Sequence, residues 1–457
     1  MKTQNPVSQW TEDTDNLLQR LFPICRSITG DGLRQTLQIL SGYTPFDLHE
    51  IPSGTQCYDW TVPDEWNIRE AYIEDSSGRR VVDFGVSNIH LVNYSTPIDV
   101  RMSFNELASH LNTLPAMPNA IPYRTSYYKR GWGFCLSQEQ FNKLDQNDTY
   151  HVVVDSSLAP GALTYGDAVL NGSSGQEYLI TTYCCHPSLA NDNLSGVVLW
   201  ALLLKELQQR SLRHSYRFVI APETIGSLVY ISQNEEQVKN LAGGLVVTTV
   251  AGQGKFGYKR TWRGNHLIDR VVERTFRELK LDYIDYPFDI SGSDERQYST
   301  PGLRIPVGTI SKDKYYEYPY YHTSLDNLDF AKAGNLVQTL QLYLLAIEKL
   351  EQNVIYRSLN PIGEPMLGKR GLYPALGGAI RQQAAASPAR DAAHATDANS
   401  FDIIYGEELD AIRWLLFYMD GKTSLLEIAE KTSLPMRQLF EIAQKLAAHG
   451  LLEEVTA

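Results

Sequence analysis

Two histidines, one aspartate and one glutamate stand in loops beside apolar runs of the sequence. His186 ends a β-branched run, and Asp192 follows it in a short polar loop. His322 lies in a polar segment farther along the chain. Two imidazoles and one carboxylate form a common three-ligand set for catalytic zinc, with the fourth position left for water. We therefore expect His186, Asp192 and His322 to be metal ligands.

Glu223 follows the apolar run at 216–221 and has no cationic neighbour in the sequence. Zinc lowers the pKa of a bound water to about 7, and a carboxylate that takes the proton contributes roughly 10²–10⁴ in rate. Glu223 is therefore the candidate general base. This chemistry would supply a zinc-activated water with a base that takes its proton.

Alternating strand and helix patterns surround these residues. Such alternation predicts a mostly parallel or mixed sheet with helices on both faces. Ligands of such sheets bind outside the carboxyl ends of the strands, which is where His186 and Glu223 fall. Two helices are expected between 11 and 42. Further strands are expected at 150–154, 177–183, 216–221, 244–250 and 306–310, and helices at 196–209, 227–233, 266–279 and 331–352.

The chain divides into three predicted domains. Short alternating runs between Asp, Ser and Gly turns predict a β-rich insertion at 55–123. It separates the two parts of the α/β domain, 1–54 and 124–355. Residues 356–400 are expected to be a connecting segment and flexible linker, since much of this stretch lacks bulky apolar residues. Residues 401–457 have the order of a winged-helix domain, with three helices and a terminal strand.

Composition restricts the location and the partners of the protein. No apolar run reaches the roughly 18 residues of a membrane span, and the five cysteines form no CxxC pair. We expect a cytoplasmic protein with no membrane partner. The net charge of −12 makes nucleic acid an unfavourable partner. The segment 403–457 carries nine acidic and five basic side chains, which favours protein contacts or oligomerisation over DNA binding.

Four segments resemble those of the zinc-dependent aminopeptidases related to bacterial leucyl aminopeptidase and glutaminyl cyclase. Ala190-Asn-Asp192-Asn-Leu-Ser-Gly196 is similar to their Ala-Asn-Asp-Asn-x-Ser-Gly loop, whose aspartate bridges two zincs. The other three are similar to Glu-Glu-x-Gly, Ser-Asp-His and Tyr-His-Thr-x-x-Asp segments. They are Glu223-Thr-Ile-Gly226, Ser293-Asp294-Glu295 and Tyr321-His322-Thr323-Ser324-Leu-Asp326.

The resemblance implies a zinc-exopeptidase-like core with three αβα layers and a mixed sheet. The whole chain is more closely similar to a bacterial aminopeptidase-like family. That family combines this core with a β-rich insertion and a C-terminal winged helix. An aminopeptidase or amidohydrolase is therefore expected, acting on a small peptide or an aminoacyl amide.

Three positions depart from the pattern of the zinc aminopeptidases. Thr224 stands where they have a second glutamate, and Ser188 stands where they have the aspartate of a His-x-Asp segment. No carboxylate occurs at 247–250, where a later acidic ligand is expected. These departures favour one zinc ion over two, with Glu223 as the base. A shifted alignment would instead make Glu223 a ligand and leave the site without a base.

The residues that bind substrate are less sharply defined. Four charged residues either support the ligands, bind the amino group or carboxylate of a substrate, or are solvated loop charges: Asp294, Glu295, Arg296 and Glu317. Tyr321 is a further candidate for substrate binding. Two other functions stay open. The chain could be a degenerate hydrolase that serves as a binding or regulatory module, or a winged-helix regulator with an enzyme-like sensor domain.

Overall fold

The structure is a computed structural model that describes residues 6–372 and 407–455. It forms two compact units. The first comprises residues 1–269 and 282–343, and the second comprises 270–281 and 344–457. Helices α8 (Leu267–Glu278) and α10 (Ala333–Glu351) each contribute residues to both units. Within the described residues, no helix combines the length and the apolar character that crossing a membrane requires.

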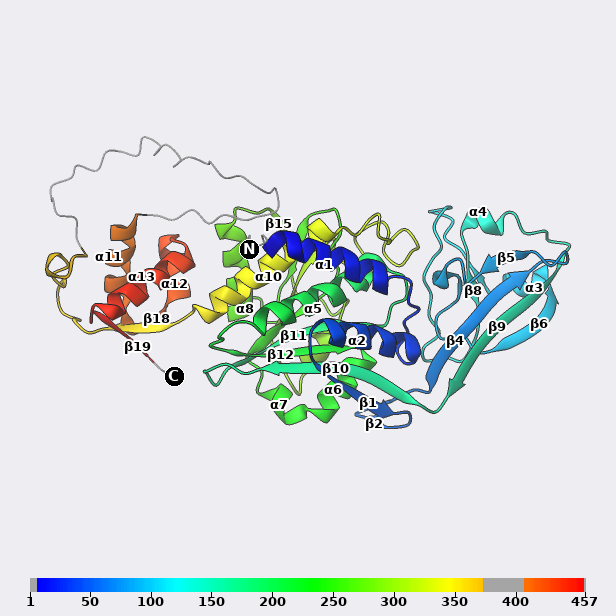
Figure 1. Ribbon diagram of the computed structural model, residues 1–457, viewed down its shortest axis with the longest axis horizontal. Coiled ribbons are helices and arrows are strands. Elements are labelled where there is room, and N and C mark those ends of the chain that lie inside the picture. The colour runs from blue at the N-terminus through cyan, green and yellow to red at the C-terminus, as the bar shows by residue number, and fades with distance from the viewer. Residues whose placement is uncertain (1–5, 373–406, 456–457) are drawn as a thin grey trace, which may run out of the picture. The chain divides into compact units, whose positions relative to one another are not determined.

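The first unit is built on an eight-stranded mixed sheet (Figure 1). The pairs β12–β11, β11–β13 and β13–β16 are parallel, whereas β10 and β14 join this central group in the antiparallel sense. Side by side, the strands are β1 (Asp47–Pro52), β10 (Ala162–Leu170), β12 (Ser215–Ala221), β11 (Glu177–Tyr183), β13 (Gly243–Val247), β16 (Val307–Lys312), β14 (Phe256–Lys259) and β15 (Tyr283–Tyr286).

Helices cover both faces of this sheet. The connections β11–α5–β12 and β12–α6–β13 cross the sheet in opposite directions, so right-handed crossovers place α5 and α6 on opposite faces. Helix α5 is apolar on almost every side because it packs on both the sheet and α1. The predicted three-layer αβα core is confirmed. Besides α8 and α10, the helices of the first unit's α/β part are α1 (Pro6–Leu21), α2 (Asp31–Tyr43), α5 (Gly196–Leu207), α6 (Ile225–Gln233), α7 (Glu235–Lys239) and α9 (Glu295–Tyr298).

A second, four-stranded antiparallel sheet is inserted between β1 and β10. It lies to one side of the main sheet within the first unit (Figure 1). Its order is β5 (Arg80–Asp83), β4 (Glu65–Glu74), β9 (Thr149–Ala159) and β6 (Ile98–Ser103). The inserted region also contains β2 (Gln56–Cys57), β3 (Trp60–Thr61), β7 (Leu111–Asn112), β8 (Phe134–Cys135), α3 (Phe104–Ala108) and α4 (Gln138–Phe141).

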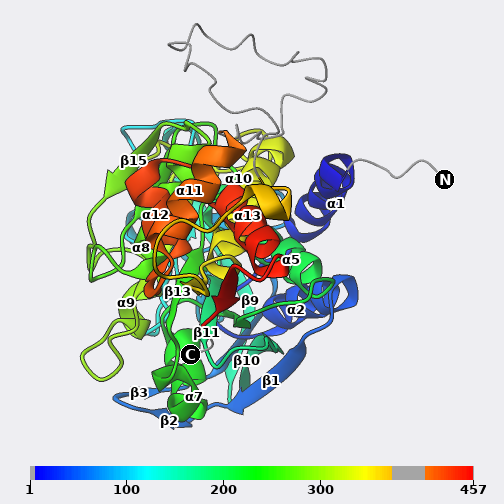
Figure 2. The same cartoon turned by 90° about the vertical axis from the view of Figure 1, so that its left-hand side faces the viewer.

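The second unit contains a winged-helix arrangement. Helices α11, α12 and α13 pack on one another (Figure 2), and a capping box between Ser424 and Glu427 begins α12. The three-stranded sheet runs β18–β17–β19. The elements are β17 (Ile355–Ser358), α11 (Glu408–Tyr418), β18 (Asp420–Ser424), α12 (Leu425–Thr432), α13 (Met436–Ala448) and β19 (Leu452–Glu454).

Some elements differ from the sequence-based expectation. The sequence predicts a strand at 150–154 as part of the α/β alternation. This strand is β9, and it pairs with β4 and β6 in the inserted sheet. The inserted sheet therefore draws on residues beyond the predicted limit at 123. Residues 355–358, expected to span the end of the α/β domain and the start of the connecting segment, form β17 of the winged helix. Most of the predicted linker at 356–400 lies outside the described residues.

Candidate active site

The carboxyl ends of the parallel strands bring the predicted site residues together. His186 lies just beyond β11, and Glu223 lies just beyond the neighbouring strand β12. The segment with His322 follows β16, and Asp192 lies in the turn that leads into α5. Parallel strands end at one edge of a sheet, which is why residues so far apart in sequence meet there.

His186, Asp192 and His322 converge around one point. Their ligand atoms lie within 4.8 Å of one another. Asp192 Oδ1 is 3.6 Å from His186 Nδ1, and Asp192 Oδ2 is 3.0 Å from His322 Nε2. The atoms His186 Nδ1, Asp192 Oδ2 and His322 Nε2 are buried without a hydrogen-bond partner among the described residues. Unpaired nitrogen and carboxylate atoms facing one point fit a zinc ion.

Asp192 is held by its neighbours on both sides. Both oxygens of the Asp326 carboxylate accept backbone N–H groups, from Asn191 at 2.6 Å and from Asp192 at 2.9 Å. The Tyr183 hydroxyl donates to Asp192 Oδ1 at 2.5 Å. Burial opposes ionisation of Asp192, but the two imidazoles outweigh it and lower the pKa of this carboxyl far below its ordinary value. Asp192 is therefore an anion, as a metal ligand must be.

Arg26 fixes the turn that carries His186. Its guanidinium is buried and donates to the carbonyl oxygens of His186 at 2.8 Å, Pro187 at 3.0 Å and Leu21 at 2.7 Å. All three guanidinium nitrogens of Arg26 thus donate to backbone carbonyl oxygens. The role of Arg26 is therefore structural, and it connects the loop between α1 and α2 to the turn that carries His186.

The His322 loop is supported by the inserted region. Its backbone has a φ of 54°, a left-handed conformation that non-glycine residues rarely adopt. The Tyr123 N–H donates to the carbonyl oxygen of His322 at 2.8 Å. The Tyr123 ring packs edge-on against the rings of His186 and His322, with centroids 5.3 Å and 5.2 Å away. Tyr123 thus belongs to the site, although sequence analysis assigned it no role.

Glu223 stands beside the three candidate ligands. Its Oε2 is 3.9 Å from His186 Nε2, and burial raises its pKa to about 8. The following residue, Thr224, has a φ of 63°, and its N–H donates to Asp294 Oδ1 at 2.8 Å. Asp294 therefore holds the backbone that presents Glu223, and it does so from a buried position.

A cavity of about 340 Å³ opens at these residues. Among the substrate-binding candidates, Arg296 and Tyr321 line it, together with Glu223 and His322. Asp294 is not in the lining. Glu317 is not in it either, and instead contacts Lys314 and Tyr286. The side chains of Tyr183, Tyr315 and Tyr316 complete much of the wall.

Two features bear on alternative ligand sets. Cys185, His186 and Glu223 also place ligand atoms within 4.8 Å of one another. Burial raises the pKa of the Cys185 thiol well above its ordinary value, so the thiolate that binds metal is disfavoured. At the end of β13, the Thr248 hydroxyl is 2.8 Å from that of Tyr183. A neutral Tyr–Thr pair therefore occupies the region where a further acidic ligand was sought.

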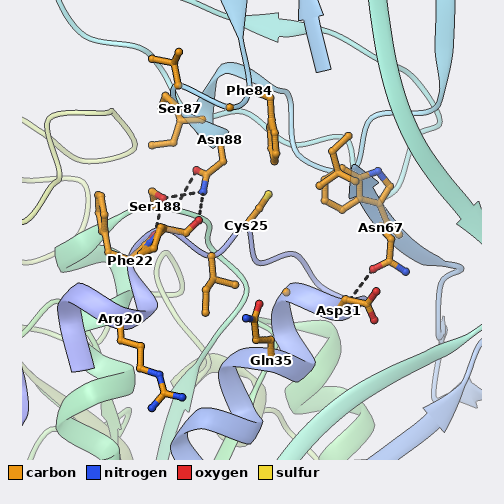
Figure 3. Close-up of a pocket in the computed structure, with 18 of the residues that line it drawn as sticks. Arg20, Phe22, Cys25, Asp31, Gln35, Asn67, Phe84, Ser87, Asn88 and Ser188 are labelled. Atoms are coloured by element: carbon orange, nitrogen blue, oxygen red, sulfur yellow. Dashed lines mark hydrogen bonds between the residues drawn. The ribbon is translucent and has the colours of Figure 1, made fainter. Parts of the chain in front are cut away.

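A larger cavity, of about 1130 Å³, lies between α2 and the inserted sheet. In Figure 3 the side chains of Cys25, Gln35, Asn67 and Phe84 face a common space. Ser188 borders it and accepts a hydrogen bond from Asn88 at 2.8 Å. The lining includes neither Glu223 nor any of the three candidate ligands. The candidate active site is therefore the smaller cavity.

Comparison with known proteins agrees with this assignment of the fold. The family model "Domain of unknown function (DUF4910)" matches residues 15–353. The chain belongs to this family. A winged helix-turn-helix model matches residues 354–389 and 399–454, which confirms the predicted C-terminal domain.

Two similar proteins come from Clostridium acetobutylicum. One is 43% identical over 440 residues, covering 96% of each chain, and its name proposes a polysaccharide biosynthesis protein with an aminopeptidase-like domain. The other is a crystal structure whose description proposes a peptidase. It is 41% identical, covers 99% of this chain and 98% of that chain, and has a TM-score of 0.88.

BSAP, a zinc aminopeptidase from Bacillus subtilis, has the same core fold. Its TM-score is 0.55 at 13% identity, over 75% of this chain and 95% of that chain. The predicted resemblance to zinc aminopeptidases is therefore confirmed at the level of the fold. A peptidase-like hydrolase fold carries the candidate site.

Proposed function

We propose that the protein is a zinc-dependent hydrolase of amide or peptide bonds. The observation that carries the proposal is the convergence of unpaired buried atoms from His186, Asp192 and His322, with Glu223 beside them. The aminopeptidase-like fold supports the same class of reaction. A bound zinc ion would supply Lewis acidity, lowering the pKa of a water and polarising the amide carbonyl.

Glu223 would move the proton in this reaction. A general base must lie within reach of the proton it takes and must have a pKa near the working pH. Glu223 lines the cavity beside His322, and its partial burial raises its pKa. It accepts a proton as water adds to the carbonyl carbon, and it donates that proton to the nitrogen as the C–N bond breaks. The products are a carboxylic acid and an amine.

The contacts of Asp192 favour one ion over two. The Tyr183 hydroxyl binds one of the carboxylate oxygens, and burial raises the pKa of Tyr183 well above its ordinary value. The Tyr183 phenol is therefore neutral and donates its hydrogen bond to Asp192 Oδ1. A second cation at that oxygen would need the lone pair that accepts this hydrogen bond. Thr224 and Thr248 add no carboxylate to that region. We infer a single zinc site with three protein ligands.

The experiment for this proposal combines metal analysis with a Glu223→Gln variant. Purified protein should contain about one zinc per chain. The variant should retain the metal, because Gln is nearly isosteric and Glu223 lies outside the ligand set. Its hydrolysis of N-acyl and aminoacyl amides should fall by roughly 10²–10⁴. Zinc well below one per chain, or undiminished hydrolysis in the variant, would contradict the proposal. Bound zinc without turnover would favour the degenerate hydrolase.

The winged helix is assigned no nucleic-acid partner. The first turn of α13 is engaged within its own unit, since Glu278 accepts the N–H of Met436 at 2.8 Å and Glu348 lies 3.6 Å from Arg437. Trp414 and Phe417 are exposed on α11, which is the character of a protein-contact surface. A role in protein contacts or oligomerisation and a cytoplasmic location stay predictions.

A further inference from the structure

The cavity at the active site has a distinctive balance of charges. Among the described residues that line it, the charged side chains are Glu223 and Arg296. The tyrosines and serines of the wall supply hydroxyl groups. Since Glu223 is the proposed base, Arg296 is the cavity's one fixed charge that is free to recognise a substrate. This inference rests on the proposed amide hydrolysis.

Arg296 is exposed to the cavity and only weakly engaged. Within the described part of the chain, its side chain makes one long hydrogen bond, to Thr224 Oγ1 at 3.3 Å. No carboxylate of these residues lies within ion-pair distance of it. An arginine that forms no ion pair and lines a substrate cavity is a candidate binding group for carboxylate or phosphate, which it can hold through two N–H donors.

Ser293 adds a second, independent donor. It lines the same cavity and is 2% exposed, and its Oγ has no hydrogen-bond partner among the described residues. A buried hydroxyl without a partner costs free energy unless a ligand completes it. Ser293 and Arg296 lie on one short segment, three residues apart.

A buried ion pair makes this segment rigid. Glu295, between Asp294 and Arg296 in sequence, is fully buried and pairs with Lys259. The Lys259 ammonium also donates to the Ser291 carbonyl at 2.8 Å, and the Tyr315 hydroxyl donates to Glu295 at 3.0 Å. Preorganised donors bind an anion at lower entropic cost than flexible ones.

An ammonium group would find no comparable partner. Asp294, on the same segment, is buried, accepts the N–H of Thr224 and does not line the cavity, and Glu295 is buried in its ion pair with Lys259. A free N-terminus would therefore have to pair with Glu223, which the reaction needs as its base. We propose that the protein cleaves an N-acyl amide that carries a carboxylate or phosphate, with the anion held by Arg296 and Ser293.

The test measures binding of matched neutral and anionic probes by calorimetry, in wild-type protein and in Glu223→Gln to prevent turnover. The carboxylate arm compares N-acetylglycine with N-acetylglycinamide. The phosphate arm compares N-acetylglucosamine 1-phosphate with N-acetylglucosamine. Glycinamide is the cationic probe. In at least one arm the anion should bind about tenfold or more tightly than its neutral partner, which is the effect of one charge-assisted contact. The arm with the larger ratio identifies the anion.

Variants distinguish an anion preference caused by Arg296 from attraction of the anion to a metal ion. Arg296→Gln should reduce the anion preference to about one, and Ser293→Ala should reduce it partially. Arg101→Gln removes the same charge from an exposed position on β6 and should leave the preference unchanged. Equal binding within both pairs, a preference that survives Arg296→Gln, or tightest binding of glycinamide would overturn the inference. These outcomes do not depend on zinc content or turnover, which test the proposed function separately.

Discussion

Asp326 binds the backbone of the metal-ligand loop through both of its carboxylate oxygens. We predict that Asp326→Asn lowers zinc affinity by roughly 10–100-fold, the usual effect of losing an outer partner of a ligand. One oxygen becomes an N–H₂ group that faces a backbone N–H, so one hydrogen bond is lost and two donors oppose each other. Competition with a chelator of known affinity measures the change.

Asp329→Asn provides the control for Asp326. Asp329 lies in the same segment but is 99% exposed on its side chain. The Asp329→Asn variant should therefore bind zinc with the affinity of the wild type. A zinc affinity of Asp326→Asn that equals that of the control would show that the loop needs no support from position 326.

At the scale of single residues, the sequence predicted the chemistry but not its supports. His186, Asp192, His322 and Glu223 could be proposed because their residue types match a known zinc chemistry and they stand in loops beside apolar runs. Tyr123 and Tyr183 could not, because a tyrosine has many uses and only the tertiary fold shows what its ring and hydroxyl contact. Asp326 lay within a recognised segment, yet nothing in its spacing showed that it binds the loop 135 residues away.

At the scale of elements, Arg26 connects the loop between α1 and α2 to the turn after β11. We predict that Arg26→Met lowers the free energy of unfolding by about 2–5 kcal/mol. The loss would leave the His186 carbonyl oxygen without a donor among the described residues, and an unsatisfied buried group costs about 1–3 kcal/mol. It would also remove one hydrogen bond each from the carbonyl oxygens of Leu21 and Pro187, which keep the N–H groups of Ile24 and Leu189. Arg26→Lys should cost less, since an ammonium can satisfy part of the set.

Urea unfolding of both Arg26 variants measures this effect, with Arg20→Met as the matched control. Arg20 is exposed at the end of α1, so its replacement should change the unfolding midpoint little. If Arg26→Met unfolded at the same urea concentration as Arg20→Met, the guanidinium would not hold the His186 turn.

The element pattern explains which parts of the fold could be anticipated. Strands β11 and β12 were visible as long apolar runs because they are buried on both faces, and α5 was visible because it is apolar throughout. Strand β9 was visible as a strand, but periodicity does not report which sheet a strand joins. Strand β17 is only four residues long and pairs with strands more than sixty residues later, so no local pattern revealed it.

At the scale of the whole first unit, Glu65 joins three parts of the chain. It begins β4 of the inserted sheet and binds Arg34 of α2 through both carboxylate oxygens. It also accepts the N–H of Ala162, where β10 begins the return to the main sheet, at 3.0 Å. The inserted sheet is thus tied to the α/β core at the point where the chain leaves it and where it returns.

The ion pair with Arg34 lowers the pKa of Glu65 to about 2. A carboxyl has a pKa of about 4.3 in an unfolded chain. Because the folded-state pKa is the lower one, ionised Glu65 stabilises the fold fully above about pH 4.3. This contribution falls as the pH drops from there towards 2.

We predict that Glu65→Gln lowers the free energy of unfolding by about 1–3 kcal/mol at pH 7, and by clearly less at pH 3. Urea unfolding at the two pH values measures the difference, with the exposed Glu139→Gln as a control that should be nearly neutral at both. An equal loss at pH 7 and pH 3 would mean that the charge of Glu65 does not join the insert to the core.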